Sequence, residues 1–99
     1  MRVYYVYMLR CVDGTFYVGV TNDFDRRFWE HCEGIDPNCY TFLRRPLRVE
    51  YVGEFEWVQE AIAFEKKLKK WSHKKKRAFA ERKWEDLRRY SFGTDRIPR

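Results

Sequence analysis

Two tyrosine-rich stretches near the N-terminus are followed by an arginine and a histidine, and these residue types at this spacing suit chemistry. The stretches are YVY at residues 5–7 and YVG at residues 17–19. Arg27 and His31 lie four residues apart, so they share one face of any helix that contains them. A guanidinium held beside an imidazole and several phenols can bind an anion and assist proton transfer.

A simpler interpretation exists for each of these side chains. Tyrosine is common in strands, and a sheet face rich in tyrosine is more often packing than chemistry. Arg27 can pair with a neighbouring acid, Glu30 or Asp23, and His31 can be a half-buried helix residue. Whether these side chains lie close together depends on the strands and helices that carry them.

Residues 3–11 and 16–21 are rich in aromatic and β-branched residues and predict the two strands of a β-hairpin. A loop of three residues that ends with Gly14 in the left-handed region pairs Cys11 with Thr15. Tyr7 then lies opposite Gly19, which leaves space beside the phenol. This register gathers one apolar face (Val6, Met8, Phe16, Val18 and Val20) and one face with Tyr5, Tyr7 and Tyr17. A loop of two residues would instead place Tyr7 and Tyr17 on opposite faces.

The remaining elements follow from periodicity and capping signals. We expect a helix over 23–33 with Asn22 as its N-cap and an end near Gly34, then a loop over 34–46. Residues 47–54 alternate as a third strand, residues 57–71 form an amphipathic helix, and Ser72 caps a helix over 73–83. The fold class is α+β, a small three-stranded antiparallel sheet flanked by helices in the order ββαβαα. Residues 1–90 are expected to form one domain, and residues 91–99 a disordered tail.

Glu65 lies at the edge of the apolar stripe of the helix over 57–71. A carboxylate at this place can point into a cleft instead of into bulk water. The simpler alternative is an ion pair with Lys69, four residues further along the helix.

Charge is distributed unevenly along the 99 residues, whose net charge is +6. Residues 1–65 hold 7 Lys/Arg and 11 Asp/Glu, whereas residues 66–89 hold 12 basic and 3 acidic residues. This density of basic residues favours a polyanionic partner, and nucleic acid in preference to other polyanions. The residues expected to bind it are Lys69, Lys70, Lys74 and Lys75. A solvated basic helix face is the alternative.

The bulk properties exclude several classes of protein. A mean hydropathy of −0.77 without a long apolar run argues against a membrane protein, and no signal-peptide pattern opens the chain. The three cysteines are odd in number and lack a CxxC motif, which predicts free thiols in the cytoplasm and no disulfide-linked partner. A zinc site from Cys32, Cys39, His31 and His73 fits no usual spacing.

The order of these residues resembles the GIY-YIG nuclease family. The YVY and YVG stretches stand where that family has its two name motifs, with Tyr5 in place of the first Gly and Val18 in place of the Ile. Arg27 follows Tyr17 by ten residues, His31 follows one helical turn later, and Glu65 lies on a later helix. The resemblance covers residues 3–89 and is similar to the short stand-alone bacterial members.

The resemblance implies a role for each position. Tyr7 is implied to be the general base or to hold the attacking water, and Tyr17 to position water or phosphate. Arg27 is implied to bind the scissile phosphate. His31 is implied to take part in proton transfer or to hold the base. Glu65 is implied to be the sole protein ligand of one divalent cation, Mg²⁺ or Mn²⁺.

Two features test this resemblance. A tyrosine with an ordinary pKa of about 10 is a poor base at neutral pH, and lowering its pKa by roughly two units takes about 2.7 kcal/mol. Arg27 and a metal ion are the expected sources. The family often carries an Asn before a tryptophan, where this chain has Glu81.

The expected function is therefore a metal-dependent endonuclease that hydrolyses phosphodiester bonds in DNA with low sequence specificity. A catalytically silent nucleic-acid-binding module that uses the basic segment 66–89 is the second interpretation. The third is an interaction domain whose basic helices bind an acidic protein.

Overall fold

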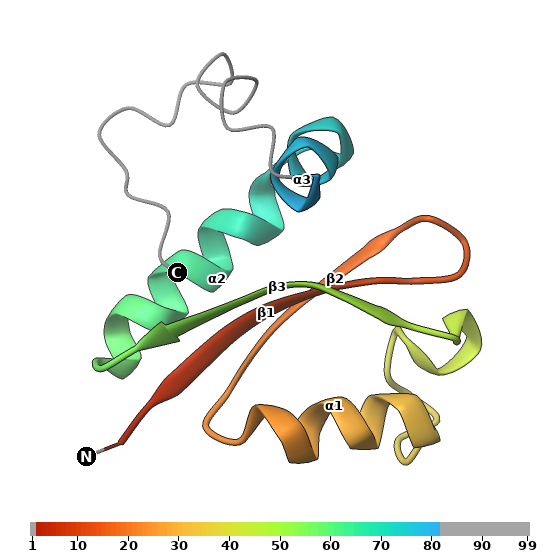
Figure 1. Cartoon of the computed structure of the whole chain (residues 1–99), viewed down its shortest axis with the longest axis horizontal. Helices are drawn as coiled ribbons and strands as arrows, with labels where there is room; N and C mark the ends of the chain where they lie inside the picture. Colours follow the sequence, from red (N-terminus) through yellow and green to blue (C-terminus); the bar gives the residue numbers. More distant parts are fainter. Residues whose placement is uncertain (1, 82–99) are drawn as a thin grey trace.

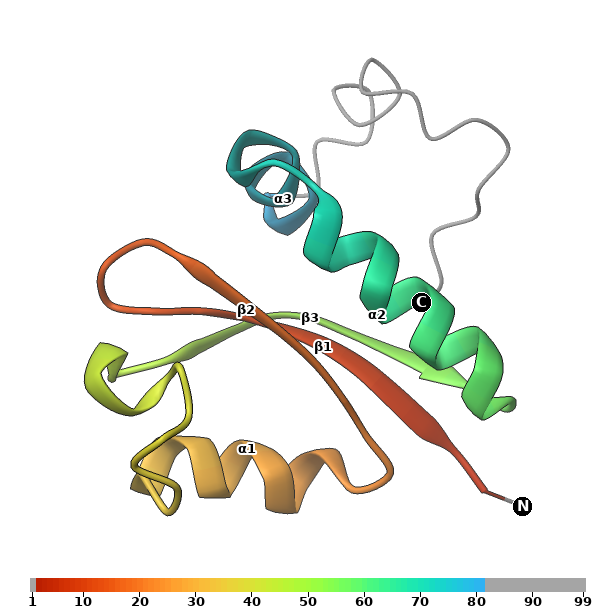
Figure 2. The ribbon, with the colours of Figure 1, turned by 180° about the vertical axis from the view of Figure 1, so that it is seen from behind.

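The computed structural model describes residues 2–81 as a three-stranded antiparallel sheet with helices on both sides (Figures 1 and 2). The strands are β1 (Tyr4–Arg10), β2 (Phe16–Thr21) and β3 (Arg48–Phe55), in the spatial order β2-β1-β3. The helices are α1 (Phe24–Glu33), α2 (Val58–Lys70) and α3 (His73–Ala80), with a short 3₁₀ turn, η1 (Phe42–Arg44), before β3. The predicted fold class and the order ββαβαα are confirmed.

The hairpin adopts the register of the three-residue loop. Tyr7 lies opposite Gly19 and Leu9 opposite Tyr17. Gly14 has φ of 85°, and the Cys11 amide donates to the Thr15 carbonyl at 2.8 Å. The tyrosine face and the apolar face of the hairpin are therefore separated as predicted.

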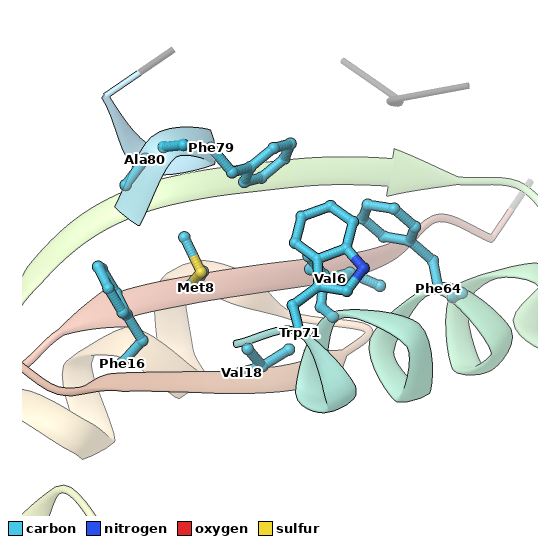
Figure 3. Close-up of a cluster of buried hydrophobic side chains, with 11 residues drawn as sticks. Val6, Met8, Phe16, Val18, Phe64, Trp71, Phe79 and Ala80 are labelled. Atoms are coloured by element: carbon cyan, nitrogen blue, oxygen red, sulfur yellow. The ribbon is translucent and has the colours of Figure 1, made fainter. Parts of the chain in front are cut away.

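The apolar face of the hairpin packs against α2 and α3 (Figure 3). The stripe of α2, formed by Ala61, Phe64 and Leu68, is buried there. Helix α1 lies on the other side of the sheet, against the tyrosine face. The sheet thus separates a hydrophobic core from the face that carries the candidate chemistry.

Capping explains where α1 begins and ends. Asp23, and not the predicted Asn22, is the N-cap, and its side chain accepts a hydrogen bond from the Arg26 amide at 3.2 Å. An Asp in this place also interacts favourably with the positive end of the helix dipole. Gly34 has φ of 67° and ends the helix as predicted.

Helix α3 begins as predicted, with the Ser72 side chain accepting a hydrogen bond from the Lys75 amide at 3.1 Å. The helix ends at Ala80 with Glu81 as its C-cap, so the predicted helix over 73–83 was too long, and residues 82 and 83 lie outside the described residues. The predicted domain limit at 90 and the tail over 91–99 also lie outside them. Over residues 2–81, no helix has the length and apolar character needed to cross a membrane.

The segment 34–46 is held against the hairpin turn. The Val12 amide donates to the Arg44 carbonyl at 2.9 Å, and the Arg44 side chain pairs with Asp13 at 3.1 Å. These contacts fix the loop where it runs past the end of α1, beside the tyrosine face.

Candidate active site

A chain of hydrogen bonds runs through the interior between β1, α1 and the segment 34–46. The Tyr7 hydroxyl lies 2.9 Å from His31 Nε2, and His31 Nδ1 lies 2.9 Å from the Thr41 hydroxyl. The Thr41 hydroxyl in turn donates to Cys39 Sγ at 3.4 Å. Tyr7 is 1% exposed, His31 3% and Thr41 1%. Across residues 2–81, every buried side-chain nitrogen or oxygen has a hydrogen-bond partner.

Gly19 makes room for the phenol at the start of this chain. A β carbon built on Gly19 would overlap the Tyr7 hydroxyl and ring, closer than real β carbons approach other atoms. The glycine of the YVG stretch is therefore required by Tyr7 across the hairpin. This confirms the space that the sequence predicted at this position.

Arg27 lies one turn before His31 on α1 and interacts with both phenols. Its guanidinium pairs with Glu30 Oε1 at 3.1 Å, and its positive charge acts to lower the pKa of Tyr7 and of Tyr17. Burial alone would lower the pKa of Arg27, but Glu30 and the two phenols raise it above its ordinary value. Arg27 thus stays a cation, while about a third of its side chain remains open to an anion.

Tyr17 is the phenol on the open side of the cluster. Its ring lies 5.1 Å from the His31 ring and 6.3 Å from the Tyr7 ring, centroid to centroid, and it is half-buried. Tyr40 from the segment 34–46 stacks on Tyr17 at 6.3 Å, and the Arg44 guanidinium lies 3.8 Å from the centre of the Tyr40 ring. A ligand that reaches Arg27 therefore meets Tyr17 before Tyr7.

The protonation of both phenols differs from the state that a general base needs. Burial raises the pKa of Tyr7 and of Tyr17 above the ordinary value, and Arg27 offsets only part of this effect. The expected lowering by Arg27 is present in sign, but desolvation outweighs it. Both phenols therefore keep their protons. Tyr7 meets almost no solvent, whereas Tyr17 is partly exposed to it.

His31 is neutral for related reasons. Burial, and then the charge of Arg27, lowers its pKa to about 4, with Glu30 acting in the opposite direction. A neutral imidazole can accept one hydrogen bond and donate another. His31 bonds Tyr7 at Nε2 and Thr41 at Nδ1, so it joins the two residues.

Glu65 lies on α2, whose buried stripe packs on the opposite side of the sheet from α1. Its side chain is 12% exposed, and its Oε2 lies 2.8 Å from Lys69 Nζ, the ion pair that the sequence offered as the alternative. Across residues 2–81, no three His, Cys, Asp or Glu side chains are grouped to hold a metal ion. The structure brings together Tyr7, Tyr17, Arg27 and His31; that Glu65 joins them around a cation stays a prediction.

The basic residues of α2 and α3 also lie across the sheet from the tyrosine cluster. Lys69, Lys70 and Lys74 are exposed, and Lys75 Nζ lies 4.5 Å from the centre of the Trp71 ring. The three cysteines, Cys11, Cys32 and Cys39, are free thiols.

Thr41 and Tyr40 were not predicted from the sequence, and Cys39 was considered only as a free thiol or a zinc ligand. All three complete the surroundings of His31 and Tyr17. No periodic signal marks them, because they lie in an irregular segment. Their position depends on long-range contacts to the hairpin turn.

Comparison with known proteins agrees with this fold. The family model described as the GIY-YIG catalytic domain matches residues 3–78. Among curated relatives, a UPF0213 protein of Bacillus pumilus is 38% identical over 78 residues, which cover 79% of this chain and 79% of that protein. A UPF0213 protein of Cupriavidus necator is 40% identical over 76 residues, covering 77% of this chain and 82% of that protein.

Two solution NMR structures are similar to the whole fold. A UPF0213 protein from Bacillus halodurans has a TM-score of 0.53 at 37% identity, covering 80% of this chain and 83% of that one. A protein from E. faecalis has a TM-score of 0.57 at 30% identity, covering 98% of this chain and 97% of that one. The chain therefore belongs to the GIY-YIG family, a family of nucleases, and is similar to its short single-domain members.

Proposed function

We propose that this protein is a divalent-metal-dependent endonuclease that hydrolyses phosphodiester bonds in DNA with low sequence specificity. The observation that carries the proposal is the cluster of Arg27 with two phenols and a neutral imidazole. A permanently charged, partly open guanidinium beside phenolic hydroxyls suits a phosphodiester. Membership of a nuclease family supports the reaction class.

Each side chain of the cluster has a distinct role in this proposal. Arg27 binds the non-bridging oxygens of the scissile phosphate and stabilises the charge that develops there. Tyr17, on the open side, orients the attacking water or the phosphate through its hydroxyl. Tyr7 and His31 are buried and support the open part of the cluster from the interior, with the His31 ring 5.1 Å from the Tyr17 ring. A role of Tyr7 as the base requires a substrate-bound state that opens its hydroxyl to water.

Glu65 is the proposed ligand of Mg²⁺ or Mn²⁺. A hard carboxylate oxygen suits either ion, and Mg²⁺ commonly binds one or two carboxylates while it keeps several waters. The sheltered position of the Glu65 side chain fits such a ligand, and Lys69 must release the carboxylate when the cation binds. When bound, the cation supplies Lewis-acid polarisation of the phosphate and stabilisation of the leaving oxygen.

The basic residues of α2 and α3 bind the DNA backbone in this proposal. Lysine side chains contact phosphates without reading bases, which is the reason for expecting low sequence specificity. The affinity should accordingly be similar for unrelated sequences of equal length.

The decisive experiment compares single substitutions in a plasmid-nicking assay with Mg²⁺ or Mn²⁺ against EDTA. Glu65→Gln keeps the size of the side chain and removes its charge, so nicking should fall by several orders of magnitude while DNA binding stays near normal. Arg27→Ala should lower both cleavage and affinity, because Arg27 contacts phosphate. Glu60→Gln, an exposed position on the same helix, is the matched control. Parental nicking by Glu65→Gln would exclude the metal-ligand role.

A catalytically silent nucleic-acid-binding module is the second candidate. The observation in its favour is Glu81, which stands where the family often has an Asn and pairs with Arg77 at 3.1 Å. Such a module would bind DNA in a salt-dependent manner and leave plasmid intact with either cation. A gel shift beside the nicking assay separates the two candidates. If neither binding nor nicking is seen, an acidic protein partner for the basic helices becomes the better interpretation.

A further inference from the structure

We infer that Thr41 is a positioning residue that fixes the tautomer of His31, and through it the orientation of the Tyr7 hydroxyl. This inference deepens the proposed function and rests on it for its catalytic consequence. It is carried by the buried chain of hydrogen bonds from Tyr7 through His31 and Thr41 to Cys39, whose direction can be worked out from the chemistry of its two ends.

Tyr7 sets the direction at one end of the chain. Its hydroxyl is protonated and almost completely buried, and a buried O–H without an acceptor is costly. Across residues 2–81, the hydrogen-bond partner of this hydroxyl is His31 Nε2, 2.9 Å away. His31 Nε2 must therefore lack a proton, and the proton of the neutral imidazole sits on Nδ1.

Thr41 makes that tautomer favourable at the other end. Its hydroxyl oxygen accepts from His31 Nδ1 at 2.9 Å, and its own hydrogen is directed to Cys39 Sγ at 3.4 Å. His31 and Thr41 are almost completely buried, so a proton on Nδ1 has little access to water. Cys39 Sγ lies 3.7 Å from Nδ1 and is a weaker, more distant acceptor.

Removal of the Thr41 hydroxyl should reverse the chain. With Thr41→Val, a buried N–H at Nδ1 would lose its acceptor, which favours moving the proton to Nε2. Nε2–H would then donate to the Tyr7 oxygen, and the Tyr7 hydrogen would lose its buried acceptor. The Tyr7 hydroxyl would lose its fixed orientation in the cluster, although Thr41 does not contact DNA in this proposal.

The test measures the His31 tautomer directly, with ¹⁵N NMR of the imidazole nitrogens in the full-length protein at neutral pH. Thr41→Val has almost the volume of Thr, and Thr41→Ser restores the hydroxyl. The expected result is a proton on Nδ1 in the parent and in Thr41→Ser, and a shift of the proton towards Nε2 in Thr41→Val. His73, the second histidine of the chain, is exposed on α3 and serves as an internal reference whose signals should not change.

Cys39→Ala is the matched control in the same loop. It removes the sulfur at the end of the chain and leaves the bond between His31 and Thr41, so the parental tautomer should persist. If Thr41→Val keeps the proton on Nδ1, or if Cys39→Ala shifts it as much as Thr41→Val does, the inference is wrong.

Plasmid nicking gives the catalytic consequence in the same set of variants. Thr41→Val should lower nicking at least about tenfold, less than the roughly 10⁴-fold known for a wrong tautomer in a serine-protease triad. Thr41→Ser should restore most of the activity. A parent protein that fails to nick would overturn the proposed function, while the NMR comparison would still decide the role of Thr41. A changed tautomer with parental nicking would overturn the link from Thr41 to cleavage.

Discussion

His31 is the residue whose protonation state depends most strongly on its surroundings. Its Nε2 faces the Tyr7 hydroxyl, and its Nδ1 faces the Thr41 hydroxyl. A second proton would place a positive charge in a buried site beside Arg27. The native structure therefore favours the neutral imidazole.

This arrangement predicts an acid-sensitive fold. The pKa of His31 is lowered to about 4 in the native state, whereas an unfolded histidine titrates near 6.5. The unfolded chain binds more protons between these values, so stability is complete above about pH 6.5 and falls as the pH drops towards 4. The loss attributable to His31 is about 3 kcal/mol.

Urea unfolding at several pH values between 4 and 7 checks this. Carboxylates also titrate in part of this range, so the comparison is between the parent and His31→Gln. The free energy of unfolding should decline less steeply with falling pH in His31→Gln. His73→Gln, at the exposed histidine, should keep the parental decline. Equal slopes for the parent and His31→Gln would show that His31 does not drive the acid response.

At the scale of elements, local signals were enough for most of the architecture. The hairpin register followed from Gly14 and from sorting apolar residues away from tyrosines, because a slip of one residue inverts both faces. Helices α1, α2 and α3 followed from periodicity and caps, with errors of one residue at the N-cap of α1 and at each end of α2. The end of α3 was predicted too late, because the helix ends at Ala80. These features depend on neighbours a few residues apart.

The segment 34–46 was predictable only as a loop. The 3₁₀ turn η1, the stacking of Tyr40 on Tyr17 and the bond from Thr41 to His31 depend on contacts between residues far apart in the chain. The burial of Tyr7 was hidden for the same reason, because alternation along β1 assigns a face and not a depth. The site could therefore be predicted as a set of residues, and its internal order could not.

Helix α1 carries both Arg27 and His31, so its N-cap should influence the site. Asp23→Ala removes the acceptor of the Arg26 amide and should lower the free energy of unfolding by about 1 kcal/mol. Fraying of the first turn should also reduce nicking, because Arg27 follows the cap by four residues. Urea unfolding and plasmid nicking measure the two effects.

Asp25→Ala is the control for this change. Asp25 is an exposed acid in the first turn of the same helix, and its loss should cost only a few tenths of a kcal/mol through the helix dipole. If Asp23→Ala is no more destabilising than Asp25→Ala, the cap contributes nothing beyond its charge.

At the scale of the whole molecule, the sheet separates the two parts of the proposed site, the Arg27 cluster and the basic helices. The cluster around Arg27 lies on the side of α1, and the basic residues of α2 and α3 lie on the other side (Figures 1 and 2). A DNA backbone that contacts both the Arg27 cluster and these basic residues must pass an edge of the sheet. Strand β2, which carries Tyr17, is one of its two edge strands.

The salt dependence of DNA binding tests whether the basic side takes part. Each phosphate neutralised by a lysine releases counterions, so affinity should fall steeply with salt. Replacing Lys69, Lys70, Lys74 and Lys75 together by Gln should weaken binding to all sequences alike. The slope of log K against log salt should become shallower by about 0.9 for each phosphate that a lysine no longer neutralises, or roughly 3 to 4 in total. Fluorescence anisotropy with two unrelated duplexes, measured over a salt series, provides both quantities.

Arg2→Gln combined with Arg48→Gln is the control for this experiment, since both arginines are exposed and lie outside α2 and α3. The decrease in affinity per charge removed should be clearly smaller for this pair, because general attraction to a polyanion is then all that changes. A quadruple variant that binds as tightly as the parent at low salt would show that the basic helices are only a solvated surface. An equal decrease per charge in both variants would show that net charge, and not the placement of these lysines, attracts the DNA.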